Sequence, residues 1–144
     1  MAITTNAIAS SFKKELLEGK HDFTASTGSA FKLAMYNSNA VLGASTTSYT
    51  TGSEVTSPAG YTAGGKALVN TGTSVASSVA ITTFGNLSFT NVTLTARGAL
   101  IYNTSNSNSA VAVLDFVSDK TATAGTFTIQ FPAYTTSAAI LRIS

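Results

Sequence analysis

Over most of this chain the hydrophobic residues follow a period of two, which is typical of β-strands. In the segment 31–36, Phe31, Leu33 and Met35 occupy every second position. Six further runs rich in β-forming residues follow: 74–82 (SVASSVAIT), 86–95 (NLSFTNVTLT), 97–104 (RGALIYNT), 110–116 (AVAVLDF), 125–131 (GTFTIQF) and 138–144 (AAILRIS). Because these runs recur about every ten residues without a helical pattern between them, they predict an antiparallel β-sandwich or a jelly-roll-like fold.

Turn-forming residues separate these runs at 84–86 (FGN), 105–109 (SNSNS) and 117–125 (VSDKTATAG). Between Phe89 and Val92 the inward-facing set of side chains shifts by one residue, which predicts a β-bulge near Asn91. Gly64 and Gly65 predict a turn or bulge that leads into a strand at 66–70.

The stretch 37–59 is polar, rich in Ser and Thr, and contains Pro58. We expect it to form a loop, with room for one short edge strand at 40–44 (AVLGA).

The segment 10–23 (SSFKKELLEGKHDF) holds six of the fourteen charged residues of the chain, which has eight basic and six acidic side chains. Around it the hydrophobic period changes to three and four residues, which predicts an amphipathic helix of about three turns. Thr5 or Asn6 is a suitable N-cap, and Gly19 suits the C-terminal end. The apolar face comprises Ile8, Ala9, Phe12, Leu16 and Leu17. We therefore divide the chain into an N-terminal helical segment, 1–22, and a single β-sandwich domain, 23–144.

The composition offers little material for catalysis or metal binding. There is no cysteine and only one histidine, which excludes thiolate chemistry and the usual zinc sites. His21 is followed by Asp22 but has no nucleophile motif near it, so we expect it in a polar turn after the helix. Asp115 and Asp119 lack the spacing and the glycine of a calcium-binding EF-hand. The glycine-rich stretch 62–68 (TAGGKAL) departs from the phosphate-loop pattern, which needs a hydroxyl after the lysine. We expect no enzyme activity, no cofactor and no metal.

Charge and hydropathy limit the partners of the chain. Charged residues make up 10% of it, the net charge is +2, and no basic stripe is present, so we expect no nucleic-acid partner. The N-terminus lacks a basic region followed by an apolar one, and no apolar run has the length of a membrane span. We expect synthesis in the cytoplasm and no membrane partner.

Several apolar and aromatic side chains are candidates for an interface. Tyrosine combines a rigid apolar ring with a polar tip, and there are five: Tyr36, Tyr49, Tyr61, Tyr102 and Tyr134. The predicted interface residues are Phe12, Leu16, Leu17, Tyr49 and Tyr61. For the tyrosines the alternative is a place at the rim of the domain's own core. For the helix, the apolar face covers either the β domain or a neighbouring subunit.

Taken together, several segments resemble a family of small virion structural proteins of tailed bacteriophages. The most specific are YTAGGKAL (61–68) and the stretch from RGALIYN to VLDFVSDK (97–120), and the likeness extends from the N-terminal helix to the final AILRIS. None of these segments is a catalytic motif. The resemblance therefore implies a location in the virion rather than a reaction, and it does not distinguish head, neck and tail.

From the resemblance and the low charge we expect a capsid decoration (cement) protein, which binds the outside of the assembled head and stabilises it. Its partners would be the major capsid protein and further copies of itself, in a cyclic oligomer that we expect to be a trimer. The first alternative is a structural component of the neck, tail or fibre base. A receptor- or carbohydrate-binding module ranks third, because such sites usually carry tryptophan and this chain has none.

Overall fold

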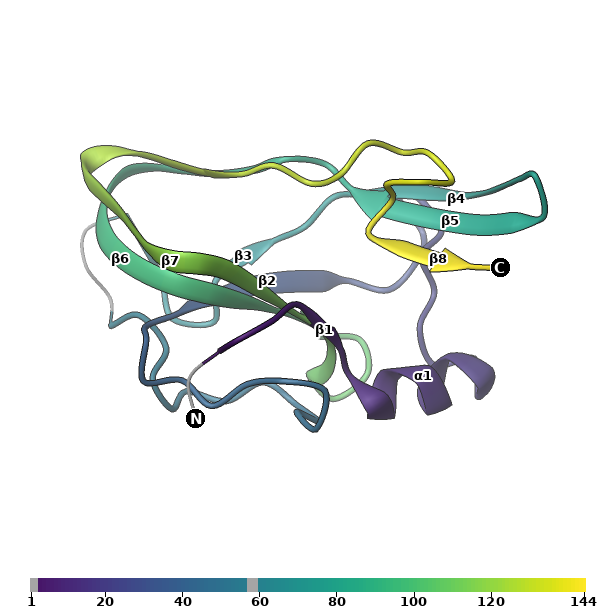
Figure 1. The fold of residues 1–144 in the computed structure, drawn as a ribbon, viewed down its shortest axis with the longest axis horizontal. Coiled ribbons are helices and arrows are strands. Elements are labelled where there is room, and N and C mark those ends of the chain that lie inside the picture. The colour runs from purple at the N-terminus through teal and green to yellow at the C-terminus, as the bar shows by residue number, and fades with distance from the viewer. Residues whose placement is uncertain (1–2, 57–59) are drawn as a thin grey trace.

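The structure is a computed structural model that describes residues 3–56 and 60–144. Two antiparallel sheets pack together beside one short helix, so the predicted β-sandwich is confirmed (Figure 1). The five-stranded sheet has the order β1-β7-β6-β2-β3, and the three-stranded sheet has the order β4-β5-β8. Along the chain the elements are β1 (Ala7–Ile8), α1 (Ser10–Leu17), β2 (Phe31–Tyr36), β3 (Lys66–Ala67), β4 (Asn70–Ala76), β5 (Val79–Phe84), β6 (Leu87–Asn103), β7 (Ser109–Ile129) and β8 (Leu141–Ile143).

Strands β6 and β7 form one long hairpin of 17 and 21 residues, which was predicted as four separate strands. The predicted loop 117–125 lies within β7 instead. Lys120, Thr121, Ala122 and Gly125 of this stretch pair with β6, and the hydroxyls of Thr95 and Thr121 are 2.8 Å apart. The hairpin bends so that its two halves lie in different layers of the sandwich (Figure 1). Register shifts accompany the bend, and the predicted bulge is confirmed between Phe89 and Val92, where Asn91 has a φ of 51°.

The chain between β3 and β5 also differs from the prediction. The expected strand 66–70 ends at Ala67, and the chain then crosses to the second sheet as β4. The run 74–82, expected to be one strand, is a hairpin. Its turn residues Ser77 and Ser78 both have positive φ, 49° and 64°, as tight β-hairpin turns require.

The loop after β2 contains no strand within its described residues, so the expected edge strand at 40–44 is absent. Two isolated bridges hold this loop to the sheet, Tyr36 to Glu54 and Ser48 to Ser109. Pro58 lies outside the described residues.

The N-terminal segment is part of the sandwich. Strand β1 pairs with β7, and Ile3 is fully buried. The predicted side-chain cap was wrong: α1 starts after Ala9 without one, because Asn6 lies before the strand and accepts a hydrogen bond from the Asp115 amide. The helix is eight residues long rather than three turns. Its predicted end is confirmed, since Gly19 has a φ of 70° and Gly19 and Lys20 donate to the carbonyls of Leu16 and Glu15.

An aromatic cluster joins the helix to both sheets. Phe23 stacks on Phe31 of β2 at 4.6 Å between ring centroids, and Phe31 meets Phe84 of β5 at 5.5 Å. Phe12 of α1 contacts Phe23 edge-on at 6.0 Å. Because one continuous core contains these rings, the position of α1 against the sandwich is fixed by packing.

Candidate functional site

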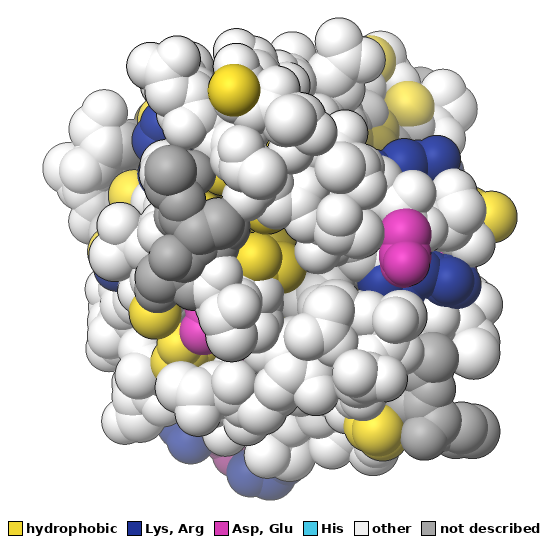
Figure 2. Space-filling view, turned by 90° about the vertical axis from the view of Figure 1, so that its left-hand side faces the viewer, with side chains coloured by type: hydrophobic (Ala, Val, Ile, Leu, Met, Phe, Trp, Pro, Cys, Tyr) yellow, Lys and Arg dark blue, Asp and Glu magenta, His cyan; other side chains and the backbone are white. Residues whose placement is uncertain are grey.

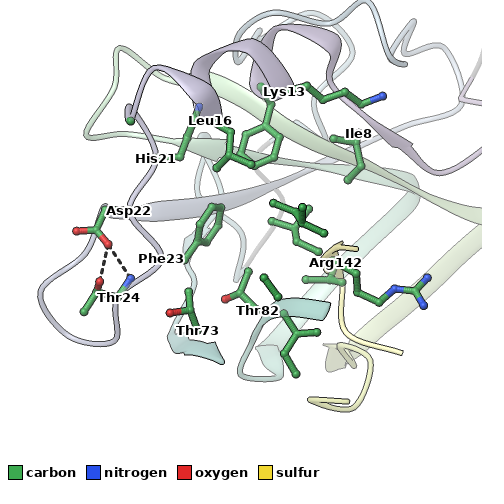
Figure 3. A pocket seen from close by; sticks show the side chains of 17 residues that line it. Ile8, Lys13, Leu16, His21, Asp22, Phe23, Thr24, Thr73, Thr82 and Arg142 are labelled. Atoms are coloured by element: carbon green, nitrogen blue, oxygen red, sulfur yellow. Dashed lines mark hydrogen bonds between the residues drawn. The ribbon is translucent and has the colours of Figure 1, made fainter. Parts of the chain in front are cut away.

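An open apolar groove of the described structure lies between α1 and the sheet β4-β5-β8, with a volume of about 770 Å³. From here on it is called the groove. Phe12 and Leu16 of α1 line the groove, and so do Ile140, Leu141 and Ile143 in and beside β8. Figure 3 shows Leu16 and Arg142 on its opposite sides. Large apolar clefts of this size are the usual binding sites of folded domains.

Charges lie only at the two ends of the groove. In Figure 3 the amino group of Lys13 and the guanidinium of Arg142 point toward one end, from opposite walls. Asp22 lies toward the other end, where its carboxylate accepts hydrogen bonds from the backbone and hydroxyl of Thr24. These hydrogen bonds hold the pKa of Asp22 below its usual value. The groove is therefore apolar along its floor and cationic at one end.

The predicted interface residues of α1 lie in three different environments. Phe12 is 3% exposed and packs in the aromatic cluster, so this side chain covers the β domain of its own chain. Leu16 is partly buried and lines the groove. Leu17 is 92% exposed. An interface role for Leu16 and Leu17 stays a prediction.

Four of the five tyrosines gather around a buried carboxylate, that of Glu54, which is 6% exposed. The hydroxyls of Tyr49 and Tyr61 each donate to it at 2.6 Å, and the backbone amide of Gly64 donates at 2.7 Å. The Tyr102 ring stacks on Tyr49 at 4.7 Å. Tyr36 joins the cluster by donating to the Thr50 carbonyl. These bonds satisfy the buried charge and fix the loop that follows β2.

The cluster holds its tyrosines in the neutral form. Burial raises the pKa of Tyr36, Tyr49, Tyr61 and Tyr102, and the neighbouring Glu54 carboxylate raises it further. A tyrosine with a raised pKa is a poor general base at neutral pH, and every hydroxyl of the four is already engaged with the protein. We therefore assign this cluster a structural role.

Tyr61 and Tyr49 were predicted interface residues, and the structure places them in this cluster instead of on an open surface. Tyr61 is 4% exposed and accepts a hydrogen bond from the Met35 amide, while Tyr49 is partly buried. Sequence reasoning missed Glu54. The available signal was a single acidic residue in a long Ser/Thr-rich stretch between tyrosines.

His21 is buried between the rings of Phe12 and Phe31, not in a polar turn as expected. Its Nε2 is 2.7 Å from a Glu15 carboxylate oxygen, and its Nδ1 is 2.9 Å from the Asn103 side-chain nitrogen. Because the Ser105 amide donates to the Asn103 side-chain oxygen, the Asn103 nitrogen faces His21 as a donor. Nδ1 is thus the acceptor, and Nε2 carries the proton donated to Glu15. The histidine ties α1 to the β6–β7 turn, and no nucleophile takes part in this network.

Among the described residues, no three His, Asp or Glu side chains come together in a way that could hold a metal ion. Within residues 3–56 and 60–144, no helix is both long and apolar enough to cross a membrane.

The face at the bend of β6 and β7 is mainly uncharged and polar (Figure 2). Most atoms on this face in Figure 2 belong to neither charged nor hydrophobic side chains. Several large apolar side chains are nevertheless exposed in the described structure: Leu17, Val41, Val69, Val75, Val117, Tyr134 and Ile143. The groove and these side chains are among the surface features that could bind a partner.

Comparisons of this chain with family models, curated proteins and solved structures found no match.

Proposed function

We propose that this chain is a structural protein of the tailed-bacteriophage virion and that it acts as a capsid decoration protein. The proposal starts from the sequence resemblance of 61–68 and 97–120 to such proteins. The structural observation that supports it best is the groove, an apolar surface left open on a small β domain with few charges. An open apolar groove with polar groups at its rim is a common feature of sites that bind a partner or a ligand.

Binding to the assembled shell would explain how such a protein acts without catalysis. A ligand that binds only the assembled state stabilises that state by mass action, and many weak sites add up over a shell. The major capsid protein and further copies of this chain are the proposed partners, in a cyclic oligomer that we expect to be a trimer.

The first test is the number of copies per purified virion, measured by quantitative mass spectrometry against the major capsid protein. A simple integer ratio to the capsid subunit is expected for a decoration protein. A copy number that suits a single ring would instead place the chain in the neck or tail, which is the second candidate location, and would contradict decoration.

A reconstitution experiment tests the mechanism. Undecorated heads incubated with purified protein should gain resistance to heat and osmotic shock. Leu17→Asp should weaken binding to heads if the helix face contacts the shell, while Val75→Asp, at another exposed apolar position on β4, serves as the control. Heads that gain no resistance from the wild-type protein would contradict the decoration role.

A further inference from the structure

A bulge in strand β7 forms a corner that projects from the five-stranded sheet. Gly98 pairs with Asp115 and Ala96 pairs with Lys120, so Phe116, Val117, Ser118 and Asp119 lie opposite the single residue Arg97. From here on residues 116–119 are called the β7 bulge. Four residues against one cannot remain in the plane of the ladder, and the chain loops out of the sheet.

Side-chain contacts hold this corner in shape. The guanidinium of Arg97 lies 3.2 Å from the Asp115 carboxylate, and the same carboxylate oxygen accepts the Val117 amide at 2.8 Å. Arg97 also donates to the Ile3 carbonyl, which ties the bulge to the N-terminal segment. The bulge is thus a supported part of the fold, even though Val117 has a φ of 69°.

The β7 bulge carries an apolar side chain and a carboxylate that the chain itself leaves without partners. Val117 is 78% exposed. Asp119 is exposed, and of the acidic residues in the described part of the chain it is the one with no hydrogen bond or ion pair; the other five are bound by Lys, Arg, His, Tyr or Thr side chains. The neighbouring Lys120 donates to Ser118 rather than to Asp119.

The groove has the complementary composition. Its walls are apolar, and its two cations have no carboxylate partner within the described residues: Lys13 is exposed, and Arg142 donates only to the carbonyls of Thr136 and Ser137. Both cationic groups point toward the same end of the groove, away from Asp22 (Figure 3). A carboxylate beside an apolar side chain fits this end better than a basic or a purely polar segment.

We propose that the groove of one copy binds the β7 bulge of a second copy, with Val117 against the apolar walls and Asp119 between Lys13 and Arg142. The groove lies between α1 and the three-stranded sheet, and the bulge lies on the five-stranded sheet, so the two surfaces are distinct. A contact between two different surfaces is head-to-tail, and it closes into a ring when the rotation between copies allows. The proposed docking rests on the proposed function, and it names the two surfaces that would build the cyclic oligomer.

The test uses two variants that each remove one side of the contact. The bulge variant is Val117→Ser with Asp119→Asn, and the groove variant is Lys13→Glu with Arg142→Glu; these four side chains are exposed, so folding should be unaffected. The control is Lys14→Glu with Lys66→Glu, two exposed cations outside the groove that change the net charge equally, while Lys20 keeps its ion pair with Glu18. Molar mass is measured by sedimentation equilibrium, and circular dichroism checks the fold.

Wild-type protein and the control should assemble, while each interface variant should associate about tenfold or more weakly. An equimolar mixture of the two variants should form a one-to-one complex, because each retains the surface that the other lacks. A monomeric wild-type protein, a groove variant that assembles like the wild type, or a mixture without the complex would each overturn the inference. The copy number per virion is measured separately, so failure of this docking is distinguishable from failure of the decoration role.

Discussion

At the scale of single residues, Gly65 is the glycine with the least room for a side chain. It has a φ of 77°, and a Cβ atom there would lie 1.8 Å from the Leu33 carbonyl oxygen of the neighbouring strand. The sequence predicted a turn at this glycine pair, but the close approach of strand β2 depends on the fold. We expect Gly65→Ala to lower the free energy of unfolding by at least about 2 kcal/mol, because left-handed backbone and backbone overlap both oppose the side chain.

Denaturant unfolding provides the measurement for this prediction. Gly43→Ala is the matched control, since a Cβ atom at Gly43 meets no atom within 4 Å and the backbone there is not left-handed. Its effect should remain within about 0.5 kcal/mol. Equal losses for the two variants would mean that the turn at Gly65 is not as tight as described.

The Tyr61 hydroxyl has two buried partners, the Glu54 carboxylate and the Met35 amide. Tyr61→Phe leaves both without that bond, and the expected loss is about 1–3 kcal/mol of unfolding free energy. Tyr134→Phe is the control, because Tyr134 is 39% exposed and makes no side-chain hydrogen bond to the described residues. A loss no larger than that of the control would contradict the structural role of the cluster.

The same cluster predicts a limit of stability at alkaline pH. Burial and the Glu54 charge raise the pKa values of Tyr36, Tyr49, Tyr61 and Tyr102 in the folded protein above the unfolded value of about 10. A raised folded-state pKa contributes stability that is present below the unfolded pKa and is lost as the pH rises through the folded one. These tyrosines should therefore ionise together with unfolding, which ultraviolet absorbance and circular dichroism can follow in parallel. Ionisation of all four in a folded protein would contradict the prediction.

At the scale of elements, we expect one apolar side chain of α1 to stabilise the folded protein and another to contribute little. Phe12 is 3% exposed in the aromatic cluster, and Phe12→Ala should cost about 3–5 kcal/mol of unfolding free energy. Leu17 is 92% exposed, and Leu17→Ala should change it by less than about 0.5 kcal/mol. Thermal or denaturant unfolding distinguishes them, and similar effects of both changes would mean that α1 does not pack on the sandwich as described.

The elements also show how far the sequence alone leads. Periodicity correctly predicted β2, the helix end at Gly19 and the bulge near Asn91, because these depend on local spacing and backbone conformation. It failed for part of β7: in the predicted loop 117–125, Lys120, Thr121, Ala122 and Gly125 pair with β6, whereas 117–119 belong to the β7 bulge. It failed also for the groove, because residues from α1 and β8 meet there only after the sheets have packed. The pairing of strands that are far apart in the sequence depends on the whole fold, and local sequence patterns do not predict it.

At the scale of the whole molecule, the β6–β7 hairpin makes the two layers one cooperative unit. Its bend carries both strands from one layer to the other, and a single hydrophobic core joins α1, β2, β5 and the hairpin (Figure 1). Neither sheet can therefore separate without exposing the core of the other, and we expect unfolding in a single transition.

Near-ultraviolet circular dichroism, which follows the tyrosine cluster, and far-ultraviolet circular dichroism, which follows all strands, should give the same midpoint in denaturant. The sheet β4-β5-β8 has three short strands and none of the clustered tyrosines. The two curves would differ if this sheet unfolded at a lower denaturant concentration than the rest of the protein. Such a difference would show that the groove wall formed by β8 can open while the five-stranded sheet remains folded.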